Sequence, residues 1–388
     1  MVFSIIIAGF GLALLIILRV GLPMRALPPP TGSLMGAVND LATDPSRPDL
    51  FSGAAQRVVP FQILYPASTP GTHATYMPEA GPQIDAIVKN HGWMSRVLFG
   101  QIGTLAAPWT DVAEPSLGGP FPVILYLPGV TGYMQMGSFQ TTELAAQGYI
   151  VITLNQPGAV AAAILPDHRI VLGLTREDAV SVIAPSYVAT RHALPAIFAE
   201  KLAPAPSIIP YFAADVPLVL DRLAQINADP AHILHGVLDL HHVGVMGMSL
   251  GAIVTAQACA TDTRIDACLM MDAPVPTMVA TTGLRQASLW ISRSKEDQRL
   301  ERVASGGWPE AEIDAQARTI DDALSHSEHG QLVQLHGLFH VDFTDLPAVQ
   351  PVLGWLGQSG LTGAIEAHRQ INRLTKEFFA ASFRKSTR

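Results

Sequence analysis

Residues 243–256 constrain the fold more than any other stretch. An apolar run from Val243 to Met246 leads into Gly247, a serine at position 249 and Gly251, and small residues typical of a helix follow. Strand, sharp turn and helix with a serine at the apex is the order of a G-x-S-x-G nucleophile elbow. The turn strains the serine backbone, and glycines on both sides avoid collisions. We therefore expect Ser249 to stand at a sheet edge, beside the amides of a helix N-terminus.

The rest of the sequence alternates between strands and helices. Apolar runs predict strands at residues 57–65, 121–127, 149–154, 243–248, 265–271, 289–292 and 332–335. Helical patterns cover residues 138–148, 214–226, 252–260, 307–330 and 365–383. Such alternation, with strands apolar on both faces, is typical of a mostly parallel sheet flanked by helices, which is an α/β fold. We expect residues 27–32 to be a linker and residues 67–117 to be irregular.

Residues 157–210 interrupt this alternation with many Ala and Pro residues. They are interpreted either as a cap or lid over the site or as a peripheral helical excursion. Residues 25–388, including this possible insert, are long enough for one large domain, and we expect them to form a single catalytic domain.

The N-terminal residues 1–24 form a separate segment. Residues 2–18 carry no charge and are at the short end of the length that crosses a bilayer. Basic residues before the run and a small-x-small cleavage site are not evident, so we favour an uncleaved membrane anchor over an export signal. By the positive-inside rule, Arg19 and Arg25 weakly favour a cytoplasmic location for the domain that follows, and the orientation stays open.

Composition and cysteine spacing exclude several classes of function. The net charge of −8 gives no general attraction to nucleic acid. The two cysteines, Cys259 and Cys268, have no metal-binding spacing, and we expect no metal and no cofactor. Because one falls in a helix and the other in a strand, we expect two buried thiols rather than a disulfide.

A serine nucleophile needs a histidine to take its proton and a carboxylate to orient that histidine. Ser249, Asp272 and His340 follow each other in the order Ser, acid, His, and each comes just after an apolar strand. That is the sheet edge where open α/β sheets build their sites. The oxyanion hole is expected to use the backbone amides of Leu250 and Val130.

Rival residues exist for the acid and the base. Glu296 and Asp297 follow the next strand, and spacing alone leaves them nearly even with Asp272. His336 lies four residues before His340 and is the main rival for the base. Four other histidines are expected before the elbow strand or within a polar helix: His241, His242, His326 and His329.

Several of these segments, taken in order, resemble the platelet-activating-factor acetylhydrolase family and its bacterial relatives. They are residues 57–66, 121–130, 238–251, 271–274 and 339–345. The resemblance implies an α/β-hydrolase fold and ester hydrolysis without a metal. It favours Asp272 as the acid and His340 as the base. The chain departs from the family at Met248, where the family usually has His, and at Pro128-Gly129, where it has His-Gly.

We therefore expect a serine esterase, of the carboxylic-ester hydrolase class. Its small-molecule substrates would be lipophilic or short-chain acyl esters, as for an acetylhydrolase or phospholipase. An alternative is a lipase-, cutinase- or chlorophyllase-like hydrolase of longer or polymeric esters. A different class is a non-catalytic, membrane-anchored binding protein on the same scaffold. The natural ester and the oligomeric state are not specified by the sequence.

Overall fold

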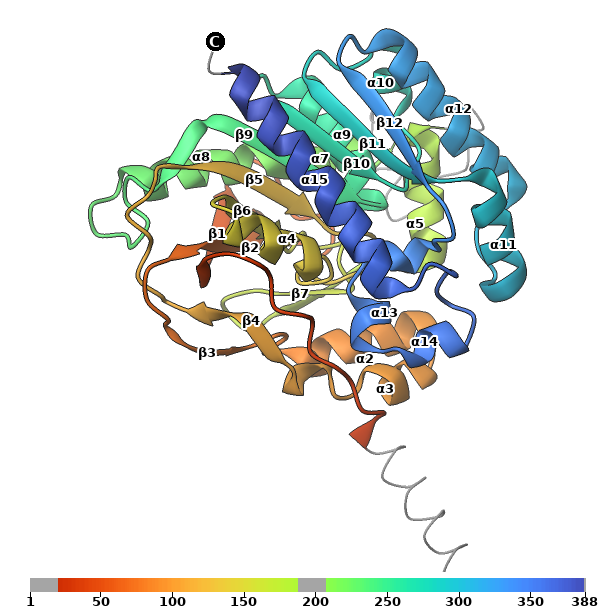
Figure 1. Ribbon diagram of the computed structural model, residues 1–388, viewed down its shortest axis with the longest axis horizontal. Helices are drawn as coiled ribbons and strands as arrows, with labels where there is room; N and C mark the ends of the chain where they lie inside the picture. Colours follow the sequence, from red (N-terminus) through yellow and green to blue (C-terminus); the bar gives the residue numbers. More distant parts are fainter. Residues whose placement is uncertain (1–19, 188–206, 387–388) are drawn as a thin grey trace, which may run out of the picture.

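The computed structural model describes residues 20–187 and 207–386, and within them one sheet of ten strands carries the fold (Figure 1). Its order is β12-β11-β10-β9-β5-β6-β2-β1-β4-β3. The strands are β1 (Leu34–Asp44), β2 (Arg57–Ala67), β3 (Thr72–Thr75), β4 (Ala106–Asp111), β5 (Phe121–Leu127), β6 (Ile150–Leu154), β9 (Leu238–Met248), β10 (Ala267–Met271), β11 (Ala287–Arg293) and β12 (Gly330–Leu335).

Strands β6, β5, β9, β10, β11 and β12 run parallel, and β2 joins this group antiparallel to β6. The expected parallel sheet is thus present. A separate hairpin consists of β7 (Ala162–Ile164) and β8 (Ile170–Leu172).

Helices cover both faces of the sheet. They are α2 (Ala80–His91), α3 (Met94–Phe99), α4 (Ser138–Ala146), α5 (Arg176–Ile183), α7 (Ile209–Ala213), α8 (Asp215–Ala228), α9 (Leu250–Thr261), α10 (Thr277–Thr282), α11 (Lys295–Ser305), α12 (Glu310–His326), α13 (Leu346–Val349), α14 (Val352–Trp355) and α15 (Ala364–Ser386). Short 3₁₀ turns are η1 (Ile102–Thr104), η2 (Ala184–Ser186) and η3 (His340–Phe343).

Two apolar cores lie on the two faces of the sheet. Along β5, Val123 and Leu125 belong to one core and Ile124 and Tyr126 to the other, as the two-residue period of a strand requires. Helices α8 and α9 cover the first face, whereas α4 and the long α15 cover the second (Figure 1). Because both faces are covered, β5 at the centre of the sheet is apolar throughout.

The N-terminal half contains more regular structure than the sequence analysis predicted. Residues 34–44 form β1, which pairs antiparallel with β2 along its whole length. Residues 67–117 are not irregular, since they contain β3, α2, α3, η1 and β4. Residues 34–44 mix apolar with small and polar residues and form no apolar run. Gly81 and Pro82 interrupt the helical pattern of α2, although proline is tolerated in a first helical turn.

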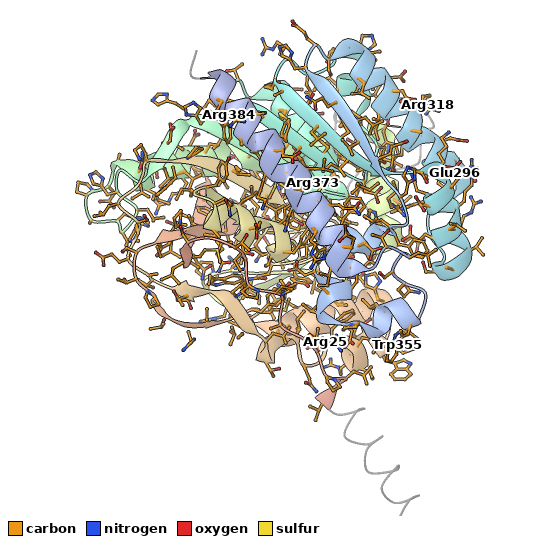
Figure 2. The ribbon with its side chains drawn as sticks, viewed as in Figure 1. Arg25, Glu296, Arg318, Trp355, Arg373 and Arg384 are labelled. Carbon is orange, nitrogen blue, oxygen red and sulfur yellow. A yellow bond between two sulfur atoms is a disulfide. The ribbon has the colours of Figure 1, made fainter. Side chains whose placement is uncertain are left out.

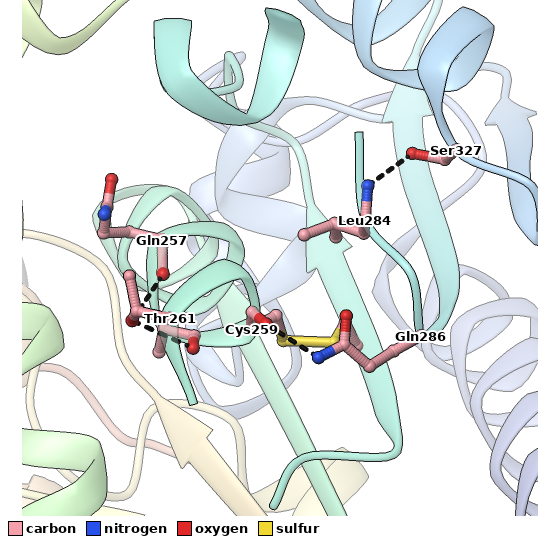
Figure 3. The surroundings of a disulfide bond; sticks show 8 residues. Gln257, Cys259, Thr261, Leu284, Gln286 and Ser327 are labelled. Carbon is pink, nitrogen blue, oxygen red and sulfur yellow. Dashed lines mark hydrogen bonds between the residues drawn. A yellow bond between two sulfur atoms is a disulfide. The ribbon is translucent and has the colours of Figure 1, made fainter. Parts of the chain in front are cut away.

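The cysteines also correct the sequence analysis. Cys259 and Cys268 form a disulfide that links the end of α9 to β10 (Figure 3). The helix packs on the strand so that the two Cα atoms lie 6.5 Å apart, within reach of a disulfide. The Gln286 side chain donates to the Cys259 carbonyl at 2.7 Å and fixes the end of the helix (Figure 3).

Two predicted segments are only partly covered by the described residues. Residues 2–18 lie outside them, and no helix in residues 20–187 and 207–386 has the length and apolar character to cross a bilayer. Within residues 157–210, the chain forms the β7–β8 hairpin, α5, η2 and the start of α7, while 188–206 lie outside the described part.

Candidate active site

Ser249 occupies the turn between β9 and α9 with φ 56° and ψ −121°. This is a conformation that few residues other than glycine adopt. A side chain on Gly251 would overlap the Leu127 carbonyl, and one on Gly247 would overlap the backbone of Gly251. The two glycines therefore allow the sharp turn that the sequence predicted.

Three non-glycine residues with positive φ gather at this sheet edge. They are Thr131 at 55°, Ser249 at 56° and Asp272 at 49°. Each follows or lies near the carboxyl end of a parallel strand, namely β5, β9 or β10. Backbone strain costs stability and persists where the surrounding fold enforces it, which is characteristic of functional sites.

The structure brings Asp272 and His340 into direct contact. Asp272 follows β10 and is buried, and His340 begins η3 after β12. The distance from His340 Nδ1 to Asp272 Oδ2 is 2.6 Å. Ser249, Asp272 and His340 all line one pocket. With Nδ1 occupied by the carboxylate, Nε2 is the ring nitrogen left for a partner in that pocket.

Two further side chains hold the Asp272 carboxylate. Arg293, the last residue of β11, donates from Nε to Oδ2 at 2.7 Å, and Gln316 of α12 donates to Oδ1 at 3.1 Å. Burial alone would raise the pKa of Asp272, but the charge of Arg293 and the hydrogen bonds from His340 and Gln316 hold that pKa below its ordinary value. Asp272 is thus a carboxylate across the physiological pH range.

Arg293 also connects the acid to the backbone of the histidine. Its Nη1 donates to Glu301 Oε2 at 2.6 Å, and Glu301 Oε1 accepts the His340 amide at 3.0 Å. Arg293 Nη2 is buried without a hydrogen-bond partner among the described residues. The sequence analysis missed Arg293, Glu301 and Gln316. An arginine closing an otherwise apolar strand was the one signal that pointed to such a network.

The rival residues lie together, away from the His340 ring. Asp297 accepts the Ser294 hydroxyl at 2.7 Å and the Gly337 amide at 3.0 Å, so it fixes the start of α11 and the loop after β12. His336 is 3.7 Å from Asp297 and is largely exposed. Glu296 is exposed beside Arg299. None of these three rivals lines the pocket with Ser249.

The other histidines are also placed. His241 and His242 lie inside β9 rather than before it, near the end opposite Ser249. His326 ends α12, and His329 follows that helix instead of lying within it.

The two amides expected to form the oxyanion hole belong to segments that adjoin the serine. Leu250 is the first residue of α9, where a helix leaves its amides without partners in the helix. A side chain on Gly129 would come 3.2 Å from Ser249 Cβ, so the loop that carries Val130 lies against the serine. The Val130 amide has no hydrogen bond within the described residues.

The pocket around these groups is mostly apolar. Its walls include Ala179, Val180 and Ile183 of α5, and Tyr187 just after η2. The Tyr187 hydroxyl forms a hydrogen bond with Glu312 of α12. The part of residues 157–210 that the structure describes therefore contributes a wall of the pocket and contacts the opposite wall.

An aromatic ring completes the pocket. Trp308, between α11 and α12, meets the His340 ring edge-on, with ring centroids 6.2 Å apart and planes at 88°.

Comparisons with known proteins support the fold. No protein-family model matches the chain, and a search of curated proteins finds no match. A solved structure, a ferulic acid esterase from Streptomyces cinnamoneus, superposes with a TM-score of 0.63 at 20% sequence identity. The likeness covers 94% of this chain and 92% of that one. The chain thus shares its overall fold with an esterase, and the sheet with its flanking helices fits an α/β-hydrolase.

Proposed function

We propose that this protein is a carboxylic-ester hydrolase that uses Ser249 as nucleophile, His340 as general base and Asp272 as the acid. The 2.6 Å contact between His340 Nδ1 and Asp272 Oδ2, in the pocket that also holds the strained Ser249, carries the proposal. The esterase with the similar fold supports it.

The proposed mechanism follows from the positions of these groups. His340 removes the proton of Ser249 as the serine oxygen attacks the ester carbonyl. The carboxylate of Asp272 keeps the imidazole in the tautomer that leaves Nε2 free to accept that proton. The amides of Val130 and Leu250 donate to the oxyanion of the tetrahedral intermediate. The alcohol leaves with the proton from His340, and water then releases the acid from the acyl-enzyme.

The pocket favours a lipophilic ester. Ala179, Val180 and Ile183 offer apolar surface to an acyl or aryl group, and Trp308 adds an aromatic ring beside the base. We include short-chain acyl esters of the acetylhydrolase and phospholipase type, as the family resemblance implies.

The deciding experiment compares hydrolysis of nitrophenyl acetate, butyrate, octanoate and palmitate by the full-length protein and by Ser249→Ala. We expect activity concentrated on the shorter chains and abolished by the substitution. Hydrolysis that persists in Ser249→Ala would refute the proposed nucleophile. Activity that rises with chain length would instead favour a lipase- or cutinase-like enzyme. Failure of the wild-type protein to react with a fluorophosphonate probe would favour a binding protein.

A further inference from the structure

A second cavity lies at the same edge of the sheet as the candidate active site. Its volume is about 320 Å³, and small-molecule sites typically measure about 300–1,000 Å³. Its walls come from β1, β2, the residue after β6, the loop after β5, the start of α2 and the β7–β8 hairpin. Side chains fill most of the space between the elements of the fold, and this cavity is one of the places that they leave open (Figure 2).

Five primary carboxamide side chains line this cavity. They are Asn39, Gln62, Gln83, Gln135 and Asn155, and all except Asn39 are more than nine-tenths buried. We call it the carboxamide cavity. Asn and Gln are mostly exposed in folded proteins, because burial of an amide without hydrogen bonds costs free energy. A cluster of buried amides therefore needs an explanation.

Much of the hydrogen-bonding capacity of these amides is unused. Asn155 Oδ1 and Gln83 Oε1 are buried without a hydrogen-bond partner in the described part of the chain. The nitrogen of the Gln83 amide donates to the Ala162 carbonyl at 2.5 Å, which fixes the orientation of that amide. The Gln135 carbonyl accepts the Tyr76 hydroxyl at 3.0 Å, whereas the Gln135 side chain has no hydrogen bond to another described residue. These amides are held in place and remain available to a ligand.

The register of the sheet explains how Gln62 comes to the carboxamide cavity. Its partners in β1 and β6 are Asn39 and Thr153, and residues directly opposed in neighbouring strands share one face. The next pair along that face, Leu64 and Val151, belongs to the apolar core. Gln62 donates to Asn39 Oδ1 at 3.3 Å, and the Thr153 hydroxyl is buried without a partner among the described residues. A polar row thus interrupts an apolar face at the cavity.

The charge of the lining indicates a neutral ligand. None of the described residues that line the carboxamide cavity is Lys or Arg, and the arginines labelled in Figure 2 lie on α12, on α15 and before β1. Of the two carboxylates in the lining, Asp40 is paired with Arg222 at 2.9 Å and Glu79 is exposed. A carboxamide both donates and accepts hydrogen bonds, as a sugar hydroxyl does. Met77 and Leu165 offer apolar contacts to the C–H groups of a sugar ring.

We propose that the carboxamide cavity binds a neutral carbohydrate through the side chains of Gln62, Gln135 and Asn155. The loop after β5 has Val130 in the candidate active site and Gln135 in the carboxamide cavity, so a bound sugar lies against the loop that adjoins Ser249. Two sources present this chemistry. One is a free sugar that acts as an effector, and the other is the sugar part of an ester substrate.

The first experiment titrates the full-length protein with glucose, galactose, xylose and mannose and follows binding by saturation-transfer NMR. We expect saturable binding of at least one sugar. Gln135→Met and Asn155→Leu remove the amides with little change in volume and should each raise its Kd about tenfold. Unfolding by urea should be unchanged, because neither side chain has a hydrogen bond to lose within the described residues.

Gln298→Met is the matched control. Gln298 is also buried with an oxygen that has no partner in the described residues, but it lies in α11 and outside the carboxamide cavity. This variant should keep the wild-type Kd. Failure of all four sugars to bind, or binding that survives both Gln135→Met and Asn155→Leu, overturns the proposal. Tighter binding of glucose 6-phosphate than of glucose overturns it too, since that result indicates an anion site.

A second measurement assigns the source of the sugar and rests on the proposed function. For a substrate sugar, the ratio of kcat/KM for methyl 6-O-acetylglucoside to that for nitrophenyl acetate should fall in Asn155→Leu and not in Gln298→Met. For an effector, glucose should change kcat for nitrophenyl acetate, and Asn155→Leu should abolish that change. An inactive enzyme would contradict the proposed function and leave the NMR result standing.

Discussion

Two arginines, Arg57 and Arg293, are buried in the sheet, and each is bonded to two carboxylates. Arg57 begins β2 and bonds Asp49 and Asp215, each at 2.7 Å. Arg293 ends β11 and bonds Asp272 at 2.7 Å and Glu301 at 2.6 Å. The two networks use the same chemistry on strands that four other strands of the sheet separate.

The networks differ in what else their carboxylates contact. Arg57 uses all three of its nitrogens, including a hydrogen bond to the Pro157 carbonyl, and its guanidinium packs 4.9 Å from the Tyr211 ring centre. The network joins β2 to the α7–α8 segment. Around Arg293, in contrast, Asp272 Oδ2 accepts from both the arginine and His340. The first network holds parts of the fold together. In the second, the Asp272 oxygen that binds Arg293 also binds the candidate base, His340.

The largest expected effect is on stability. Arg57→Met leaves Asp49 and Asp215 buried with fewer partners, and removal of one member of a buried ion pair costs about 3–5 kcal/mol of unfolding free energy. Urea denaturation measures this loss. The control is Arg222→Met, which breaks the partly exposed pair with Asp40 and should cost about 1 kcal/mol or less. Equal losses in the two variants would contradict the interpretation that the buried Arg57 network contributes more to stability than a partly exposed ion pair.

The second prediction concerns the pH dependence of kcat/KM. The proposed base works only while the His340 ring is uncharged, so activity falls at low pH. The positive charge of Arg293 opposes a positive charge on that ring, and the negative charge of Glu301 favours it. Arg293→Gln should therefore move the acid limb to higher pH and Glu301→Gln should move it to lower pH.

Opposite shifts separate an electrostatic role from simple support of the fold. Asp272 of β10 and Glu312 of α12 are the other charged groups around the pocket, and both remain in these variants. Arg293→Lys keeps the charge and should restore the wild-type limb in part. Shifts of the same sign in the two Gln variants would show that Arg293 and Glu301 act only by holding the structure.

A smaller effect is expected at Gln316. Its amide donates to Asp272 Oδ1 at 3.1 Å and to the Ser292 hydroxyl at 3.0 Å. Gln316→Leu removes a hydrogen bond worth about 1 kcal/mol, which corresponds to about a fivefold fall in kcat. Steady-state kinetics at the optimum pH measures it. A fall in KM alone, with kcat unchanged, would show that Gln316 serves the pocket wall and not the acid.

The smallest effect is a change in the acid sensitivity of folding. Burial would raise the pKa of Asp49, but hydrogen bonds from Ser52 and the charge of Arg57 lower it overall. A lowered folded-state pKa gives stability that is complete above the ordinary value and lost as the pH falls through the folded-state value. Below about pH 4, the unfolding temperature of the wild type should therefore fall more steeply with decreasing pH than that of Arg57→Met. Parallel curves would exclude a role for Arg57 in the ionisation of Asp49.

Local patterns were sufficient to predict the parallel strands and the elbow. Val243 to Gly251 encode strand and turn within nine residues, and β5, β6 and β10 are each a short apolar run. The shorter predicted strands at 289–292 and 332–335 lie within β11 and β12. The three residues chosen from their order in the sequence, Ser249, Asp272 and His340, line one pocket. Their catalytic roles stay predictions.

Contacts between distant segments were not predictable. Spacing in the sequence did not decide between Asp272 and Asp297 as the acid. Only the packing of η3 beside β10 places the His340 ring against Asp272. The arginine at the end of β11 was a signal for a buried network, but its position in the sequence does not identify Asp272 and Glu301 as its partners. The disulfide was missed although its cysteines are nine residues apart, because only the packing of α9 on β10 brings them together.

The link between Cys259 and Cys268 has a consequence for where the protein matures. It staples the helix that begins after Ser249 to the strand that ends before Asp272. Disulfides persist in oxidising compartments and are rare where glutathione and thioredoxin keep thiols reduced. We therefore propose that the domain folds in an oxidising compartment, contrary to the cytoplasmic side that Arg19 and Arg25 weakly favoured.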